Sequence, residues 1–170
     1  LIGSGAREHA IAETLKKNSS VELFSFMKSR NPGISSLSKN IEIGNYSDLH
    51  KIKSFSKKNN VDFAFIGPED PLNYGVVDAL NEIGIEAIGP TKKLAQLETS
   101  KSFTRNLLEK YSIDGNPKFM VFDKNNFDEI KDFLSELDGI AIKPDGLTAG
   151  KGVKVQGDHF QTKKEALEYC

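Results

Sequence analysis

The stretch Val61-Asp62-Phe63-Ala64-Phe65-Ile66-Gly67-Pro68 decides the fold class of this chain. Its first six residues are apolar except for Asp62, and the pair Gly67-Pro68 ends the run. A nearly continuous apolar run of this length is typical of a strand that is buried on both faces, as the strands of a parallel sheet are. The stretch therefore predicts a central parallel strand.

Strands and helices alternate on both sides of this strand. Further strands are predicted over residues 21–27, 41–43 and 85–88. Helices are predicted directly after Gly5, after a cap at Ser47, and over residues 72–83 with an end at Gly84. The tripeptide Asn31-Pro32-Gly33 is predicted to be a loop, because proline and glycine interrupt regular elements. This alternation predicts an α/β fold, a doubly wound parallel sheet, over residues 1–90.

The pattern changes after residue 90. Two helical stretches are predicted between residues 92 and 111, followed by a strand at 118–122, a helix at 127–137, strands at 140–143 and 152–155, and a helix from Thr162. Thr162 and Glu165 have the spacing of a capping box. We expect three parts: an α/β domain over residues 1–90, a helical linker over 91–116, and the opening part of an α+β domain over 117–170.

The composition excludes several classes of function. The 170 residues include 23 Lys and Arg against 24 Asp and Glu, whereas proteins that bind nucleic acids through their phosphates usually carry a clear basic excess. The one cysteine, Cys170, excludes an intrachain disulfide. No apolar run approaches the ~20 residues that cross a bilayer. We expect a soluble, cytoplasmic protein with neither a membrane nor a nucleic-acid partner. The sequence does not indicate its oligomeric state.

The ends of the chain suggest trimming. Only Leu1 and Ile2 precede a glycine-rich turn, where a strand of ~5 residues is usual, and there is no initiator Met. The helix predicted from Thr162 has only about two turns before the last residue. We therefore expect a piece of a longer protein.

The first loop whose residues are suited to binding a ligand is Gly3-Ser4-Gly5-Ala6-Arg7-Glu8-His9. Glycines let the backbone approach an anion, helix N-terminal amides point at it, and Arg7 favours a terminal phosphate, which a guanidinium binds with two hydrogen bonds. A tight turn that needs glycine is one alternative. A dinucleotide fingerprint is another, but Glu8 stands at its third glycine and no acidic residue ends the second strand. His9 is expected on a helix face or in the core.

The second loop is Gly67-Pro68-Glu69-Asp70-Pro71-Leu72. Parallel sheets bind ligands outside the carboxyl ends of their strands, so this loop and the first are expected to face one crevice. Glu69 is interpreted as an acceptor for sugar hydroxyls. Asp70 is interpreted instead as the cap of the next helix, with Pro71 at the first helical position.

The third loop is Lys143-Pro144-Asp145-Gly146-Leu147-Thr148-Ala149-Gly150-Lys151-Gly152. Its glycines and lysines are typical of a flap over polyphosphate, where backbone amides and ammonium groups share the negative charge. It is not a Walker motif, because only three residues separate Gly146 from Gly150 and a glycine follows Lys151. A glycine-rich hairpin with solvated lysines is the alternative.

Together these loops resemble a known enzyme family, the phosphoribosylamine–glycine ligases or glycinamide ribonucleotide synthetases of the ATP-grasp superfamily. The matching stretches are residues 3–10, 66–72, 89–91 continuing to 97–103, and 142–153. The resemblance spans nearly the whole chain. It implies a Rossmann-like domain, similar to the N-terminal domain of biotin carboxylase, followed by the first part of an ATP-grasp α+β domain.

The resemblance also implies a reaction. In this family ATP, glycine and 5-phosphoribosylamine give ADP, phosphate and glycinamide ribonucleotide through glycyl phosphate, a step of purine biosynthesis. The family uses Mg²⁺ or Mn²⁺, whose ligands we expect beyond residue 170, as we do the glycine site. We therefore assign no catalytic or metal-binding residue here, and we expect this chain not to be a ligase by itself.

The resemblance finally implies two sets of binding residues. The set for phosphoribosylamine is Gly5, Arg7, Glu8, Asn31, Gly33, Gly67 and Glu69. The set for ATP is Lys101, Lys143, Asp145, Gly146, Gly150, Lys151 and Gly152. Two alternatives stay open: another ATP-grasp carboxylate–amine ligase or carboxylase, and a non-catalytic nucleotide-binding module. Arg7-Glu8-His9 and Gly67-Pro68-Glu69 favour the named family over the first of these alternatives.

Overall fold

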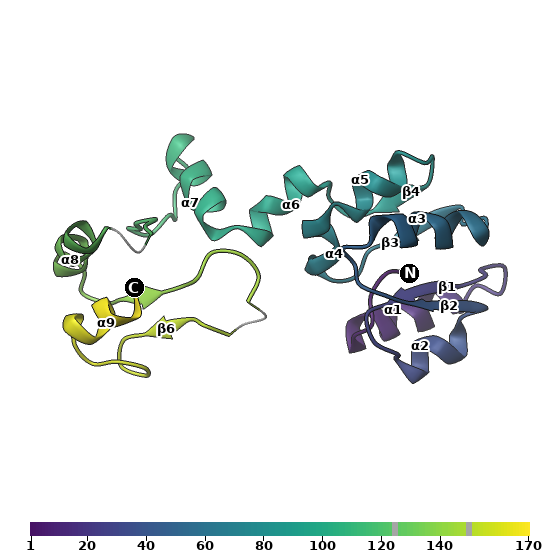
Figure 1. The fold of residues 1–170 in the computed structure, drawn as a ribbon, viewed down its shortest axis with the longest axis horizontal. Coiled ribbons are helices and arrows are strands. Elements are labelled where there is room, and N and C mark those ends of the chain that lie inside the picture. Colours follow the sequence, from purple (N-terminus) through teal and green to yellow (C-terminus); the bar gives the residue numbers. More distant parts are fainter. Residues whose placement is uncertain (124–125, 149–150) are drawn as a thin grey trace. The chain divides into compact units, whose positions relative to one another are not determined.

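A computed structural model describes residues 1–123, 126–148 and 151–170 (Figure 1). The chain divides into a first unit, Leu1–Glu98, and a second unit, Thr99–Cys170. The boundary between them falls inside the segment 91–116 that was predicted to be a linker, directly before the last residue of helix α6 (Lys92–Thr99).

The first unit alternates strands and helices along the chain. Its strands are β1 (Phe24–Met27), β2 (Asn40–Ile43), β3 (Phe63–Phe65) and β4 (Glu86–Ile88). Its helices before α6 are α1 (Ala6–Lys16), α2 (Pro32–Leu37), α3 (Leu49–Lys58), α4 (Glu69–Tyr74) and α5 (Val76–Asn81). The α/β alternation predicted from the apolar pattern is confirmed.

Ile2 lies at the centre of the sheet in the first unit. Strands β1 and β2 pair in parallel, as do β3 and β4, and Ile2 forms parallel bridges to both Phe26 and Ile66. The Ile2 amide donates to the Phe65 carbonyl at 2.8 Å, and the Gly67 amide donates to the Ile2 carbonyl at 2.9 Å. The order β2-β1-Ile2-β3-β4 is that of a doubly wound sheet, in which ligands bind outside the carboxyl ends of the central strands.

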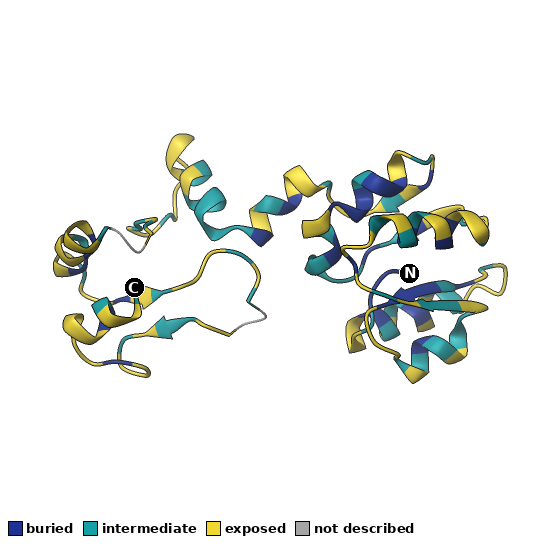
Figure 2. Ribbon diagram, in the orientation of Figure 1, coloured by how far each residue is buried: buried dark blue, intermediate teal, exposed yellow. Residues whose placement is uncertain are grey.

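Helices cover both faces of this sheet, as Figure 1 shows. On one face α3 and α5 pack against a core that contains Ile2 and Phe26, and on the other α1 and α2 pack against Leu23 and Met27. Phe26 is 1% exposed and meets the Phe55 ring edge-on, with 6.1 Å between ring centroids. Buried residues accordingly lie on β1, at the centre of β3 and on the helix sides that face the sheet (Figure 2).

The prediction of a loop at Asn31-Pro32-Gly33 was wrong. Helix α2 begins at Pro32, and the Asn31 side chain accepts a hydrogen bond from the Ile34 amide at 3.1 Å as its N-cap. Proline is well tolerated at the first helical position, because the amide it lacks has no partner inside the helix there. The residues that looked like breakers therefore start a helix.

Two other helix boundaries also differ from expectation. Asp48, not Ser47, caps α3 by accepting from the Lys51 amide at 2.9 Å. The single helix predicted over residues 72–83 is two helices, α4 and α5, because Gly75 between them adopts a left-handed backbone with φ of 83°. Glycine adopts that conformation without the steric penalty that a Cβ atom brings.

In its described residues the second unit combines helices with one antiparallel pair of strands. Its elements are α7 (Lys101–Lys110), α8 (Phe127–Ser135), β5 (Ala141–Ile142), β6 (Lys154–Val155) and α9 (Lys163–Tyr169). The capping box predicted at Thr162 is confirmed, since Thr162 and Glu165 each accept from the other's backbone amide at 3.2 Å.

The prediction of a strand at residues 118–122 was wrong, because this segment has no regular secondary structure. Its apolar side chains Met120 and Phe122 pack against a core formed by Ile130, Leu134 and Phe160 among others. These two side chains are thus partly buried without pairing in a strand ladder. Among the helices within residues 1–123, 126–148 and 151–170, none combines the length and the apolar character needed to cross a membrane.

Candidate functional site

Two of the predicted site loops lie side by side in the first unit. Residues 3–5 follow Ile2, and residues 67–69 follow Ile66, its bridge partner in the sheet. A Cβ atom added at Gly3 would lie 2.9 Å from the Pro68 side chain, so the two loops touch. Both emerge at the carboxyl ends of central strands, where a doubly wound sheet binds its ligands.

Glu8 fills the space between these two loops. Its side chain is 4% exposed, and it accepts a hydrogen bond from the Gly5 amide at 2.7 Å. Cβ atoms added at Gly3, Gly5 and Gly67 would lie 2.4, 2.8 and 2.2 Å from Glu8 atoms. These glycines therefore leave room for the Glu8 side chain. Its carboxylate faces the loop backbone, so its part in the site is to hold the loops in place.

Arg7 joins the two loops on their exposed side. Its guanidinium lies 3.2 Å from a Glu69 carboxylate oxygen and 3.3 Å from one of Glu8. The hydrogen bonds to Glu69 and Glu8 raise the pKa of Arg7. The pKa of the Glu69 carboxyl is lowered, first by its own backbone amide and also by Arg7. Arg7 is thus a fixed cation whose side chain is 60% exposed and accessible to an anion.

Asn31 and Gly33 support the first loop from the start of α2. The Asn31 amide group donates to the carbonyls of Ser4 and Gly5 at 3.1 and 3.4 Å. A Cβ atom at Gly33 would lie 2.1 Å from the His9 ring, so that ring packs against the glycine. His9 lies on α1, which confirms its expected place on a helix. The segment Asn31-Pro32-Gly33 is therefore joined to the first loop.

Asp70 does not cap a helix, contrary to the prediction. Helix α4 begins at Glu69, two residues before the predicted start at Pro71, so Pro71 is its third residue and not its first. The Asp70 carboxylate instead lies 3.3 Å from the Lys28 ammonium group. Lys28, which stands at the end of the second strand where a dinucleotide site would have an acidic residue, was not among the predicted site residues. Its place directly after β1, at the same edge of the sheet as Arg7, was the signal that could have found it.

In the second unit the structure brings Lys101 next to Asp145 and Gly146, which are predicted ATP-binding residues 44 and 45 positions later in the chain. Asp145 accepts from the backbone amides of Lys101 and Ser102, at 2.7 and 3.2 Å, and from the Ser102 hydroxyl at 2.5 Å. The Lys101 ammonium group donates to the Gly146 carbonyl at 2.8 Å. Partial burial raises the pKa of the Asp145 carboxyl. The hydrogen bonds from Ser102 and Lys101, together with one from the Gly146 amide, outweigh this effect and lower the pKa to about 2.

The remaining predicted ATP residues lie along the third loop. Lys143 directly follows β5 and is exposed, and so is Lys151, whose amide donates to the Thr148 carbonyl at 2.9 Å. Gly152 has a left-handed backbone, with φ of 90°. Gly150 lies outside the described residues. In the part of the loop that is described, no hydrogen bond or ion pair links the Lys143 or Lys151 side chain to the Asp145 cluster.

Replacing Asp145 with asparagine is expected to lower the free energy of unfolding of the second unit by about 1 kcal/mol at pH 7, because it weakens charge-assisted hydrogen bonds from the Lys101 and Ser102 amides at a partly exposed site. The carboxyl pKa lies below its ordinary 3.8. The contribution is therefore complete above pH 3.8 and disappears as the pH falls through about 2. Hydrogen exchange of the α7 amides at pH 5 and pH 2.5 measures it; an equal difference between the two proteins at both values would contradict the assignment.

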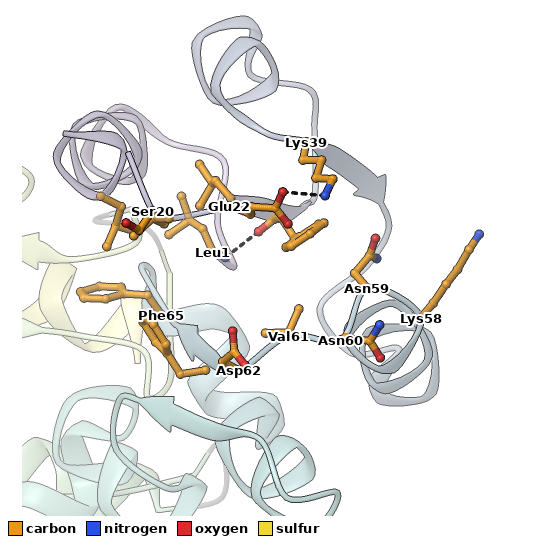
Figure 3. A pocket seen from close by; sticks show the side chains of 15 residues that line it. Leu1, Ser20, Glu22, Lys39, Lys58, Asn59, Asn60, Val61, Asp62 and Phe65 are labelled. Atoms are coloured by element: carbon orange, nitrogen blue, oxygen red, sulfur yellow. Dashed lines mark hydrogen bonds and ion pairs between the residues drawn. The ribbon is translucent and has the colours of Figure 1, made fainter. Parts of the chain in front are cut away.

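A cavity of about 740 Å³ lies at the opposite edge of the sheet in the first unit (Figure 3). It is lined by segments that precede β1 and β3, at residues 20–23 and 59–62, and by Leu1. None of the predicted site residues lines it. The cavity thus belongs to the amino ends of the strands, whereas the loops with Arg7 and Glu69 belong to the carboxyl ends.

The described residues do not bring together three His, Cys, Asp or Glu side chains that could hold a metal ion. No metal site is therefore assigned within them. The chemistry that they do assemble is a cation and a carboxylate over a glycine-rich turn in the first unit, and a lysine beside a glycine-rich loop in the second.

Two family models together match the whole chain. The model described as "Phosphoribosylglycinamide synthetase, N domain" matches residues 1–98, and the model described as "Phosphoribosylglycinamide synthetase, ATP-grasp (A) domain" matches residues 99–170. The junction between the two matches coincides with the boundary between the two units of the structure.

Curated relatives agree with these models. A protein named phosphoribosylamine–glycine ligase from Methanococcus vannielii is 49% identical over 174 aligned residues, which cover 100% of this chain and 39% of the relative. One of the same name from Methanocaldococcus jannaschii is also 49% identical, with the same coverage. The chain thus spans about two fifths of the length of the curated relatives it matches.

Solved structures confirm the predicted fold class. The biotin carboxylase domain of Hydrogenobacter thermophilus 2-oxoglutarate carboxylase, solved with MgADP, ADP and bicarbonate, matches 98% of this chain and 38% of its own, with a TM-score of 0.75 and 12% identity. A phosphoribosylglycinamide synthetase from Anaerococcus prevotii matches 98% of this chain and 39% of its own, with a TM-score of 0.62 and 16% identity. Identities this low show the fold alone.

Proposed function

This chain belongs to the phosphoribosylglycinamide synthetase family, and from that premise we propose that its first unit binds the phosphoribosyl group of 5-phosphoribosylamine. We propose further that the whole protein ligates glycine to that amine with ATP. The single observation that carries the first proposal is the position of Arg7 and Glu69, 3.2 Å apart on adjacent loops at the carboxyl ends of central strands.

This pair supplies the two kinds of group that a phosphorylated sugar needs. A guanidinium binds a phosphate with two parallel charge-assisted hydrogen bonds, and a carboxylate accepts hydrogen bonds from sugar hydroxyls. Gly5, Gly33 and Gly67 lack side chains that would cover the loop backbone. Glu8 and Asn31 act indirectly, because their side chains bond to the loop itself. The proposed roles are thus phosphate binding for Arg7 and ribose binding for Glu69.

The second unit is proposed to hold the ATP phosphates. Lys101, Lys143 and Lys151 supply positive charge, and Gly146, Gly150 and Gly152 belong to a flap that closes over the nucleotide. Lys101 now donates to the Gly146 carbonyl, so a bound phosphate would replace that carbonyl as its acceptor. Asp145 positions Lys101 by holding the first turn of α7. Excluding water there protects an acyl phosphate from hydrolysis.

The proposed reaction of the whole protein has two steps. The glycine carboxylate attacks the terminal phosphorus of ATP, which forms glycyl phosphate and releases ADP. The amine of phosphoribosylamine then attacks the acyl carbon, which forms the amide and releases phosphate and a proton. A divalent cation, Mg²⁺ or Mn²⁺, would neutralise charge on ATP, and no described residue is assigned to it. The single cysteine supports a cytoplasmic setting as part of this proposal.

Replacing Arg7 with methionine is expected to weaken binding of ribose 5-phosphate to this chain by about ten- to thirtyfold, because one charge-assisted contact is lost. Calorimetric titration measures the dissociation constant. Replacing Glu69 with glutamine should weaken ribose 5-phosphate binding but not the binding of inorganic phosphate, which has no sugar hydroxyls. The first unit should keep its stability, because exposed ion pairs contribute little to it.

The control for Arg7 is Lys39→Met, which removes one positive charge and an exposed ion pair with Glu22 elsewhere in the first unit. This variant should bind ribose 5-phosphate like the unmodified chain. Equal dissociation constants for Arg7→Met and Lys39→Met would remove Arg7 from the site.

A further inference from the structure

Two ion pairs connect the same two regions of the first unit. Arg7 pairs with Glu69 at 3.2 Å, and Lys28 pairs with Asp70 at 3.3 Å. The two carboxylates are consecutive residues in the first turn of α4, and the two cations follow neighbouring strand segments, Ile2 and β1. The exposed fractions of the side chains also match, at 60% and 40% for the first pair and 58% and 36% for the second.

The backbone of Lys28 is held in place while its side chain remains accessible. Its amide donates to the hydroxyl of Tyr46 at 3.3 Å, and Tyr46 is buried in the core at 3% exposure. The ammonium group therefore extends from a fixed position at the carboxyl end of β1. A fixed cation with an exposed head is suited to binding an anion from solvent.

Asp70 has no structural task that would hold it against Lys28. Among the described residues no side chain caps the N-terminus of α4, and the carboxylate of Asp70 bonds to the lysine instead of a backbone amide. An exposed ion pair of this kind contributes little to stability and exchanges readily with other ions. A phosphate offers Lys28 a doubly charged acceptor and is the stronger competitor.

We propose that Lys28 is a second phosphate-binding cation of the phosphoribosyl site, and that Asp70 is the counter-ion of Lys28 that a bound phosphate displaces. This inference rests on the proposed function of the first unit. It adds to Arg7 a cation from a different element, so that a phosphate is held from two sides. Asp70 keeps the charge of the empty site balanced, as Glu69 does for Arg7.

The test measures binding of inorganic phosphate and of ribose 5-phosphate to the chain by calorimetric titration. Lys28→Met should weaken both by about tenfold, the effect of one charge-assisted contact. Asp70→Asn should strengthen both by about two- to threefold, because it removes a competing anion and a like charge. Lys39→Met and Glu22→Gln are the matched controls, since they break an exposed pair of the same charges at 2.6 Å and should change neither constant.

The outcomes separate this inference from the proposed function. Unchanged binding in Lys28→Met with weaker binding in Arg7→Met would overturn the role of Lys28 and leave the phosphoribosyl site standing. Weaker binding of inorganic phosphate in Asp70→Asn would overturn its role as a displaceable counter-ion. A chain that binds neither compound, or that binds both equally well in all variants, would overturn the site and this inference together. Lys28→Gln serves as a second variant if the methionine substitution impairs folding.

Discussion

Replacing Phe26 with alanine is expected to lower the free energy of unfolding of the first unit by about 3–5 kcal/mol, the usual range for a fully buried phenylalanine. Phe26 is 1% exposed and lies on β1, next to Ile2 in the centre of the sheet. Its ring contacts Phe55 at 6.1 Å and Tyr46 at 6.4 Å between centroids. Truncation would leave a cavity between the sheet and α3 that these rings cannot fill.

Hydrogen exchange of amides in β1 and β3 measures this effect, because it reports the opening of the first unit separately from the second. The control is Phe63→Ala, also in the sheet but at a side chain that is 46% exposed. That variant should lose less than about 1 kcal/mol, since it removes little buried area. Equal losses in the two variants would show that the Phe26 ring is not part of a packed core.

Replacing Gly67 with alanine is expected to lower the free energy of unfolding of the first unit by about 3 kcal/mol, at the upper end of the effects of overpacking. The added Cβ atom would lie 2.2 Å from Cγ and 2.7 Å from Cδ of Glu8. Glu8 cannot move aside without cost, because it is buried and holds both the Gly5 amide and Arg7. We expect ribose 5-phosphate binding to weaken as well, since a shift of Glu8 displaces Arg7.

Hydrogen exchange of the β3 amides and calorimetric titration measure the two effects. The control is Gly139→Ala, where no atom lies within 4 Å of an added Cβ and the backbone is not left-handed. Its effect on the second unit should stay within about 0.5 kcal/mol. In the double variant Gly67→Ala with Glu8→Ala the two losses should be less than additive, because the second change removes the clash. Additive losses would contradict the contact between Gly67 and Glu8.

The sequence predicted the elements of the first unit well and the starts of its helices less well. Val61–Ile66 and the other apolar runs identify strands through a pattern that each run carries by itself. The prediction missed the start of α2 because Asn-Pro-Gly is equally typical of a turn and of a capped helix. The choice depends on Asn31, whose amide group reaches the carbonyls of Ser4 and Gly5, far away in sequence.

The same distinction between local sequence signals and contacts distant in sequence applies to the candidate site. Arg7 and Glu69 could be selected from the sequence, because glycine-rich loops after strands are a local signal. The burial of Glu8 could not, since it depends on Gly67 lying against it once Ile2 and Ile66 are adjacent in the sheet. Lys28 was missed for a related reason. Its partner Asp70 looked like a helix cap until the start of α4 at Glu69 left that carboxylate free to pair with the lysine.

The α/β alternation, the glycine-rich loops and the charged residues that those loops carry follow from the amino-acid sequence alone. These features depend on side chains within a few positions of one another, where periodicity and turn chemistry act. Three further features depend on the folded chain: Ile2 lies between β1 and β3, Glu8 is enclosed by three glycines, and Lys28 faces Asp70. Those outcomes depend on which strands become neighbours, and burial of the shared apolar core selects that arrangement over the whole unit.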